Sequence, residues 1–298
     1  MFLAGHPSQG CFGLQSHCAP CYFFNQASFY PSDFSFRNWD DHISHIDKVL
    51  ERIQDDTRLT IKPTKCKFAQ DSVKYLGHVV GLGKRSPAQL KVQTILDFPV
   101  PRTKTQVRAF WGIAGYYRQY IPMFSSLAAP LTELLKGKSK KGYINWTSEC
   151  QESFVQLKEK LSTNPVLYAP DFKRQFILQT DASDTGIGIV LAQRNDRGEE
   201  HPILYLSKKF SEAEKVYCTT EKECAAIVYA VKKLNGYLDG QQKFIIQTDP
   251  NPLVWLKTNA GTNPRLMRWS LALQPFNFEV IHKPGRSHVN ADALSRID

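Results

Sequence analysis

Four acidic residues in the second half of the sequence stand where predicted strands and helices begin or end. They are Asp181 at the end of a strand, Glu223 in the first turns of a long helix, Asp249 after another strand, and Asp292 at the start of a short terminal helix. Carboxylates that converge from separate elements repel one another unless cations neutralise them. Mg²⁺ prefers such hard oxygen ligands, and two ions about 4 Å apart can activate a water and stabilise the leaving oxygen of a phosphodiester. The pattern indicates metal-dependent phosphodiester chemistry.

Each of these carboxylates also has a purely structural interpretation. Asp181 precedes a Ser-Asp-Thr-Gly turn that it could shape. Glu223 could simply complement the dipole at a helix N-terminus, and Glu221 competes for its chemical role. Asp249 and Asp292 could be helix caps. Spacing alone does not choose between the two interpretations.

Alternating strands and helices are predicted around these acids. Pro165 and Pro170 mark a linker, after which the residue pattern changes to strands. The strands are expected at 175–180, 186–193, 202–207, 244–248 and 276–283, and the helices at about 219–237 and 263–274. This order predicts an α/β (α+β) domain over residues 171–298, a normal size for one fold.

The preceding part, residues 38–165, is predicted to be mainly helical. Helices are expected after Asp40, from Pro87 as a first helical residue, after a Thr103 capping box, and from Thr147. Short strands are expected at 59–68 and 73–81, and a basic loop at 135–142. Residues 1–37 hold almost no charge and show no period, which predicts poor structure.

Composition bounds the partners and the compartment. The chain has 298 residues, a formal net charge of +10 and a pI of about 9.2, which favours a polyanionic partner such as nucleic acid. We expect no membrane span and no signal peptide. Seven scattered cysteines suit a reducing, intracellular compartment, whether cytoplasm or nucleus. Cys18 and Cys21 could bind zinc with Cys11 and His17, but no second Cys/His pair follows at finger spacing.

The segments TDAS, TTEKE, TDPNPL and NADALSR, in this order, resemble the ribonuclease H domain of gypsy-type LTR retrotransposon polyproteins. The resemblance implies a mixed five-stranded sheet flanked by helices. It also implies an endonuclease that cuts the RNA strand of RNA–DNA hybrids and leaves 5′-phosphate and 3′-hydroxyl ends. The metal-binding set would be Asp181, Glu223, Asp249 and Asp292, holding two Mg²⁺ ions, with Mn²⁺ as a substitute.

Further residues follow from the same resemblance. Pro250 stands where the third motif usually has His, a position not expected to bind metal. His282 matches a mobile His that assists product release or proton transfer, although it could be only a strand residue. Recognition should depend on phosphates, 2′-hydroxyls and minor-groove shape. The expected backbone contacts, which could equally be solvated surface residues, are Arg265, Arg268, Lys283 and Arg286.

Residues 39–170 resemble the palm end, thumb and connection of a gypsy-type reverse transcriptase. Tyr75 and Gly77 lie in the segment that resembles its primer grip and are expected to contact nucleic acid. The Tyr-x-Asp-Asp hairpin should fall near 28–31, where the sequence has Ser28-Phe29-Tyr30-Pro31. Without those aspartates, polymerase activity of this chain alone is not expected.

Two alternatives to the nuclease remain open. The chain could be a non-catalytic nucleic-acid-binding remnant, or a piece of a larger RNA-directed DNA polymerase. Without its palm, the chain is also expected to expose an apolar thumb surface that would promote self-association.

Overall fold

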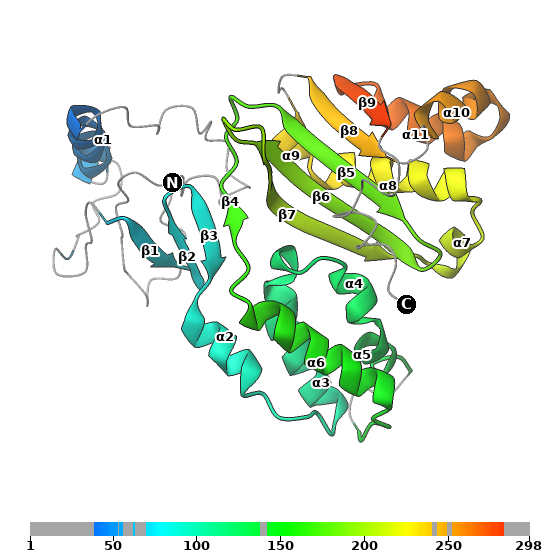
Figure 1. Ribbon diagram of the computed structural model, residues 1–298, viewed down its shortest axis with the longest axis horizontal. Helices are drawn as coiled ribbons and strands as arrows, with labels where there is room; N and C mark the ends of the chain where they lie inside the picture. Colours follow the sequence, from blue (N-terminus) through cyan, green and yellow to red (C-terminus); the bar gives the residue numbers. More distant parts are fainter. Residues whose placement is uncertain are drawn as a thin grey trace. The chain divides into compact units, whose positions relative to one another are not determined.

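The computed structural model describes residues 39–52, 54–55, 62, 70–137, 142–239, 243–248 and 252–282 (Figure 1). The chain divides into two compact units, Met1–Ala88 and Gln89–Asp298. Several expectations fall outside the described residues: those on residues 1–37, the strand at 59–68, the terminal helix, and the site residues Asp249, Lys283, Arg286 and Asp292.

The described residues of the first unit form a helix and a three-stranded antiparallel meander. Helix α1 spans Trp39–Arg52, as predicted. The strands are β1 (Ser72–Tyr75), β2 (His78–Gly81) and β3 (Lys84–Pro87), joined by two-residue turns at 76–77 and 82–83. All four turn residues have positive φ, between 44° and 79°. Positive φ at both central residues is what a type I′ hairpin turn requires, and glycine supplies it at the second position of each turn.

Two sequence predictions in this unit are wrong. The single strand expected at 73–81 is a hairpin, because Leu76 and Gly77 reverse the chain in its middle. Pro87, expected to begin a helix, instead ends β3, and helix α2 begins at Gln89. Proline fixes φ near −65°, which both a helix start and a strand end accept, so the residue type did not discriminate between them.

The first part of the second unit is helical, as expected. It contains α2 (Gln89–Leu96), α3 (Lys104–Tyr116), the 3₁₀ turn η5 (Arg118–Tyr120), α4 (Phe124–Leu127), α5 (Ala129–Glu133) and α6 (Ser148–Ser162). The predicted capping box of α3 is confirmed: Thr103 accepts from the Gln106 amide, and the Gln106 side chain accepts from the Thr103 amide. Thr147 caps α6. Buried Phe110, Leu131 and Leu157 form part of the core between these helices.

The rest of the second unit is built on a mixed five-stranded sheet, which confirms the predicted fold class. After the short strand β4 (Leu167–Tyr168) come β5 (Phe176–Ala182), β6 (Gly186–Arg194), β7 (Glu200–Lys209), β8 (Phe244–Thr248) and β9 (Phe278–His282). The strand order is β7-β6-β5-β8-β9. Strand β6 is antiparallel to β5 and β7, whereas β5, β8 and β9 are parallel. Pro202 is tolerated in β7 because it lies at a register shift on an edge strand.

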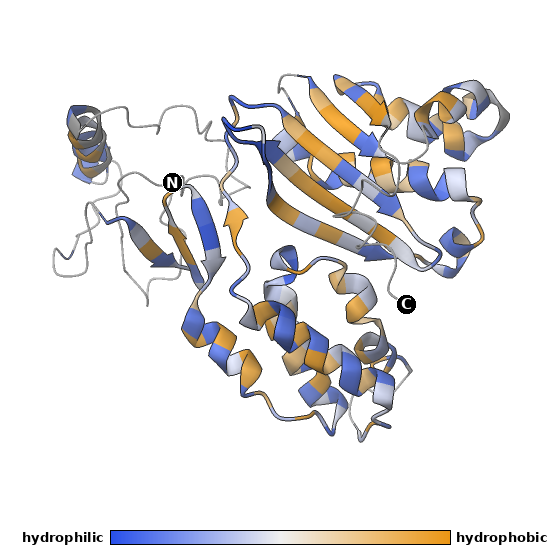
Figure 2. Ribbon diagram, in the orientation of Figure 1, coloured by the Kyte–Doolittle hydropathy of each residue, from blue (hydrophilic) through white to orange (hydrophobic). Residues whose placement is uncertain are grey.

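Helices pack against one face of this sheet. They are α8 (Thr219–Lys233), α9 (Asn235–Leu238), α10 (Pro252–Asn259) and α11 (Pro264–Leu273). The short helix α7 (Glu212–Lys215) precedes α8 and buries no residue, and the 3₁₀ turn η6 (Ala260–Thr262) joins α10 to α11. The sequence predicted α8 and α11 but not α10. The longest of them, α8, buries Ile227 and Val231 against Phe176 and Leu178 of the central strand. The hydrophobic stretches of the strands are visible in Figure 2.

The other face of the sheet contacts the helical part of the same unit. Ile177, Val190 and Ile245 form a small apolar cluster with buried Met123. Beside it, the Ser125 amide donates to the Ser207 hydroxyl over 2.8 Å, and the Ser125 hydroxyl donates to the Ser207 carbonyl over 2.9 Å. The domain boundary expected at 165–171 falls inside this unit and stays a prediction. No helix in the described ranges is long and apolar enough to cross a membrane.

Candidate active site

The carboxyl ends of three parallel strands meet at one edge of the five-stranded sheet. Strand β5 ends at Ala182, β8 at Thr248 and β9 at His282, and the register pairs Thr248 with His282. Asp181 is the last residue but one of β5 and is half-buried. Parallel topology thus brings three strand ends to one edge of the sheet. Each has a candidate residue in it or directly after it, and open α/β sheets place their sites at this edge.

Helix α8 brings Glu223 to the same edge. The Glu223 side chain is buried, with 4% of the residue exposed. Its Oε1 accepts a hydrogen bond of 3.1 Å from the backbone amide of Ala182, the residue after Asp181. Glu223 therefore lies at the end of the strand that carries Asp181, although 42 positions separate the two acids in the sequence.

The competing acid, Glu221, binds other groups of the protein at the start of α8. Its Oε2 accepts the amide of Cys218 over 3.1 Å and closes the capping box of α8. Its Oε1 forms an ion pair with Arg265 of α11. Both oxygens of Glu221 are thus committed to holding the start of α8, which favours Glu223 as the carboxylate of the site.

Arg265, expected to contact nucleic acid, is engaged within the protein. Besides its ion pair with Glu221, its guanidinium lies 4.2 Å from the ring centroid of Tyr217 and 5.5 Å from that of Trp269. Cation–π contacts of this kind hold a guanidinium in place. Arg268 is exposed and donates to the Pro264 carbonyl over 3.2 Å.

A buried lysine also connects α8 to the end of β5. Lys222 Nζ lies 2.6 Å from Asp184 Oδ1, and the exposed fractions of the two side chains are 10% and 97%. The hydrogen bond from Lys222 lowers the pKa of Asp184. The sequence analysis missed this pair. The available signal was the run of charged residues Glu221, Lys222 and Glu223, because successive side chains of a helix project in different directions.

The remaining predicted site residues are only partly described. Tyr75 and Gly77 lie in the β1–β2 hairpin of the first unit, and His282 is the last residue of β9. Within the described ranges, no group of three or more His, Cys, Asp or Glu residues could hold a metal ion. Asp181 and Glu223 nevertheless fit Mg²⁺ by the chemistry of their donors, because both offer hard carboxylate oxygens and Glu223 is hydrogen-bonded to the residue that follows Asp181.

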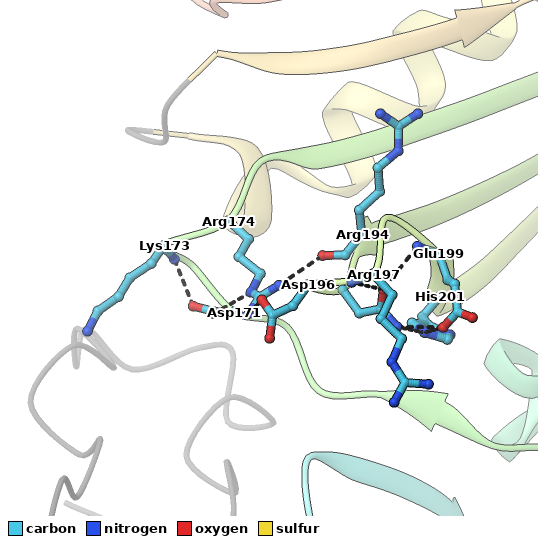
Figure 3. A network of polar contacts seen from close by, with 9 residues as sticks. Asp171, Lys173, Arg174, Arg194, Asp196, Arg197, Glu199 and His201 are labelled. Atoms are coloured by element: carbon cyan, nitrogen blue, oxygen red, sulfur yellow. Dashed lines mark hydrogen bonds and ion pairs between the residues drawn. The ribbon is translucent and has the colours of Figure 1, made fainter.

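The opposite end of β6 carries a separate network of charged groups (Figure 3). Arg174 lies between Asp171 and Asp196, with its Nη2 atom 2.7 Å from Asp196 Oδ1. Asn195 and Glu199 continue the network into the β6–β7 turn. Acidic and basic groups pair within it, and it shares no residue with the carboxylate edge.

Comparison with known proteins defines the class first. Residues 171–276 match the family described as the RNase H-like domain found in reverse transcriptase. The second unit therefore contains an RNase H-like domain of the reverse transcriptase type, as its sequence motifs predicted.

Similarity to curated proteins extends over most of the chain. It is 36% identical over 257 residues to the retrovirus-related Pol polyprotein from transposon 297 and 37% identical over 268 residues to that from transposon gypsy, both of Drosophila melanogaster. It is 36% identical over 260 residues to the transposon Tf2-3 polyprotein of Schizosaccharomyces pombe. These alignments cover 86%, 87% and 86% of this chain but only 23%, 25% and 19% of the relatives. The chain is a homologue of one part of retrotransposon Pol polyproteins.

Solved structures support the fold. The foamy viral protease-reverse transcriptase in complex with an RNA/DNA hybrid superposes with a TM-score of 0.69 at 20% identity, over 84% of this chain and 34% of that protein. The same enzyme in complex with dsDNA gives a TM-score of 0.71 at 20% identity, over 84% of this chain and 52% of that protein.

Proposed function

We propose that this protein is a metal-dependent endonuclease that cuts the RNA strand of RNA–DNA hybrids. The observation that carries the proposal is the hydrogen bond from the Ala182 amide to Glu223, which brings Glu223 to the strand end that carries Asp181 in an RNase H-like domain. Asp249 and Asp292 complete the proposed set. They are included because of their sequence motifs alone.

In the proposed site, the protein contributes carboxylates that are held in place before a cation binds. The ladder between β5 and β6 holds the backbone of Asp181, and the Ala182 amide holds Glu223 Oε1, so both residues sit on ordered elements before a cation binds. The Ala182 bond occupies Glu223 Oε1 and orients the carboxylate plane. Mg²⁺, when bound by these acids, supplies an activated water and stabilises the leaving 3′ oxygen. His282, at the end of β9, is proposed to assist proton transfer or product release.

The proposed partner is a nucleic-acid duplex. The net charge of +10 favours a polyanion, and the similar foamy viral enzyme is described in complex with an RNA/DNA hybrid and with dsDNA. Arg268 is exposed on α11, whereas Arg265 contributes through its neighbours rather than as a free cation. Tyr75 and Gly77 are proposed contacts in the first unit.

Cleavage of a labelled RNA–DNA hybrid in Mg²⁺ tests the proposal. We expect cutting of the RNA strand that is lost in EDTA and in Asp249→Asn, with double-stranded DNA left intact. A folded chain that binds the hybrid without cutting it contradicts the nuclease and supports a binding remnant. Extension of a primer by this chain would instead support a polymerase piece.

A further inference from the structure

Three consecutive residues of α8 each contact a different element. Glu221 pairs with Arg265 of α11, Lys222 with Asp184 of the β5–β6 turn, and Glu223 with the Ala182 amide of β5. Because residues on a helix surface are separated by about 100°, three neighbours can reach in three directions. The start of α8 is thereby held from several sides at the point where it presents Glu223.

The Lys222 contact differs from an ordinary surface ion pair. Its side chain is 10% exposed, so the aliphatic stem is buried and the ammonium alone reaches the rim, where Asp184 is 97% exposed. Lysine side chains are rarely buried without a partner, and Asp184 is the partner of Lys222 at 2.6 Å. The buried stem limits the positions that the ammonium can take.

Asp184 belongs to a rigid turn. The Ser183 amide donates to the Gly186 carbonyl over 2.9 Å, and the Ser183 hydroxyl oxygen accepts from the Gly186 amide over 3.2 Å. The Thr185 carbonyl accepts from the Phe210 amide over 2.9 Å, which joins the turn to the end of β7. Because Asp184 belongs to this turn, its bond to Lys222 links α8 to the turn that directly follows β5.

Lys222 and Glu223 both hydrogen-bond from α8 to the end of β5 and its turn, but the donor lies on the helix in one bond and on the strand in the other. Lys222 of the helix donates to the turn, whereas Ala182 of the strand donates to Glu223 of the helix. We propose that Lys222 is a positioning residue for the Asp181–Glu223 pair, because its bond to Asp184 sets the spacing of α8 from the end of β5. This inference rests on the proposed function for its catalytic meaning and on the two contacts for its geometry.

Variants of the full chain test this role. Lys222→Met keeps the buried stem and removes the ammonium, and Asp184→Asn keeps the shape of a side chain that is 97% exposed but removes its charge. The matched control is Asp196→Asn, which removes a similarly exposed acid that pairs with Arg174 at the other end of β6. Lys222→Arg tests rescue by a cation of similar length.

Two readouts are expected to change together. Hydrogen exchange of the Ala182 amide should become faster in Lys222→Met and in Asp184→Asn. The Mg²⁺ concentration for half-maximal cleavage should rise by about tenfold, the size typical for residues that orient metal ligands. The double variant should be no worse than the poorer single variant, Lys222→Arg should recover most of the loss, and Asp196→Asn should behave as wild type.

Opposite results overturn the inference. Unchanged Ala182 exchange and Mg²⁺ requirement in Asp184→Asn would exclude the positioning role, as would a lowered melting temperature without either change. If the wild-type chain does not cut the hybrid, the proposed function fails by itself. Exchange of the Ala182 amide then still decides whether Lys222 sets the spacing of α8 from β5.

Discussion

The backbone amide of Ala182 donates a hydrogen bond of 3.1 Å to Oε1 of Glu223. This bond joins the end of the central strand to the second turn of α8 and brings Glu223 to the strand end that carries Asp181. It also leaves the carboxylate in one orientation, because a backbone donor at the end of a paired strand cannot move far.

Glu223 and Glu221 should respond differently to the same substitution. Glu223→Gln should lower cleavage of the hybrid by about a hundredfold or more, as the loss of one oriented transition-state contact typically does. The melting temperature should change little, because the amide oxygen of glutamine can still accept from Ala182.

Glu221→Gln is the matched comparison. It should keep cleavage within a few-fold of wild type but lower stability by about 2 kcal/mol, since it weakens the ion pair with a partly buried Arg265. Loss of cleavage in Glu221→Gln, with Glu223→Gln still active, would exchange the roles of the two acids.

Arg265→Ala should act on stability rather than on nucleic-acid contact. The substitution removes the partner of Glu221 and the cation that stacks on Tyr217 and Trp269, so denaturant unfolding should report a loss of about 1–3 kcal/mol. The salt dependence of hybrid binding should stay as in wild type.

Arg268→Ala is the corresponding test of a phosphate contact. Arg268 is exposed, so its loss should leave stability unchanged and should reduce the slope of log affinity against log salt by about 1. A reduced slope for Arg265→Ala at wild-type stability would contradict the assignment of Arg265 to the protein interior.

Gly186→Ala should destabilise the second unit. A Cβ at this position would lie 2.6 Å from the Lys208 carbonyl oxygen, so the β6–β7 ladder must shift. We expect a loss of about 1–3 kcal/mol in denaturant unfolding. Gly112→Ala in α3 is the control: a Cβ there meets nothing within 4 Å, and the helix should gain about 0.5–1 kcal/mol. Equal stability of the two variants would contradict this prediction.

The β1–β3 meander should open more readily at acid pH. Burial and the nearby charge of Arg85 lower the pKa of His78 from 6.5 to about 4. Below pH 6.5 the opened segment therefore binds a proton that the folded segment does not, and stability falls as the pH drops from about 6.5 to 4. The equilibrium constant for opening should rise by at most about tenfold for each pH unit, and by less than that because the ring is partly exposed.

Hydrogen exchange of the β2 amides, corrected for the intrinsic effect of pH, measures this opening. His78→Gln removes the titrating group and should flatten the pH dependence between 4 and 6.5. A variant with the same pH dependence as wild type would assign the effect to other groups.

Sequence periodicity was sufficient for most of the second unit. The strand expected at 244–248 is β8, and those expected near 175 and 186 are β5 and β6, because buried central strands are nearly continuous apolar runs. The α3 capping box was predicted from four residues because its bonds are local. The β1–β2 hairpin was missed because its turn carries Leu76, a residue that rarely has positive φ.

The sequence by itself determined which residue types could form a carboxylate site, in the order and at the element ends where such a site needs them. The residues alone left Glu221 as a competitor of Glu223, the resemblance favoured Glu223, and Arg265 was expected to contact nucleic acid. Only the tertiary structure showed that Glu221 binds Arg265 and that Glu223 binds the end of β5, because strand pairing and helix packing decide which side chains meet. A motif records spacing along the chain, whereas the contacts of Glu223 with Ala182 and of Glu221 with Arg265 depend on elements 41 and 44 residues away.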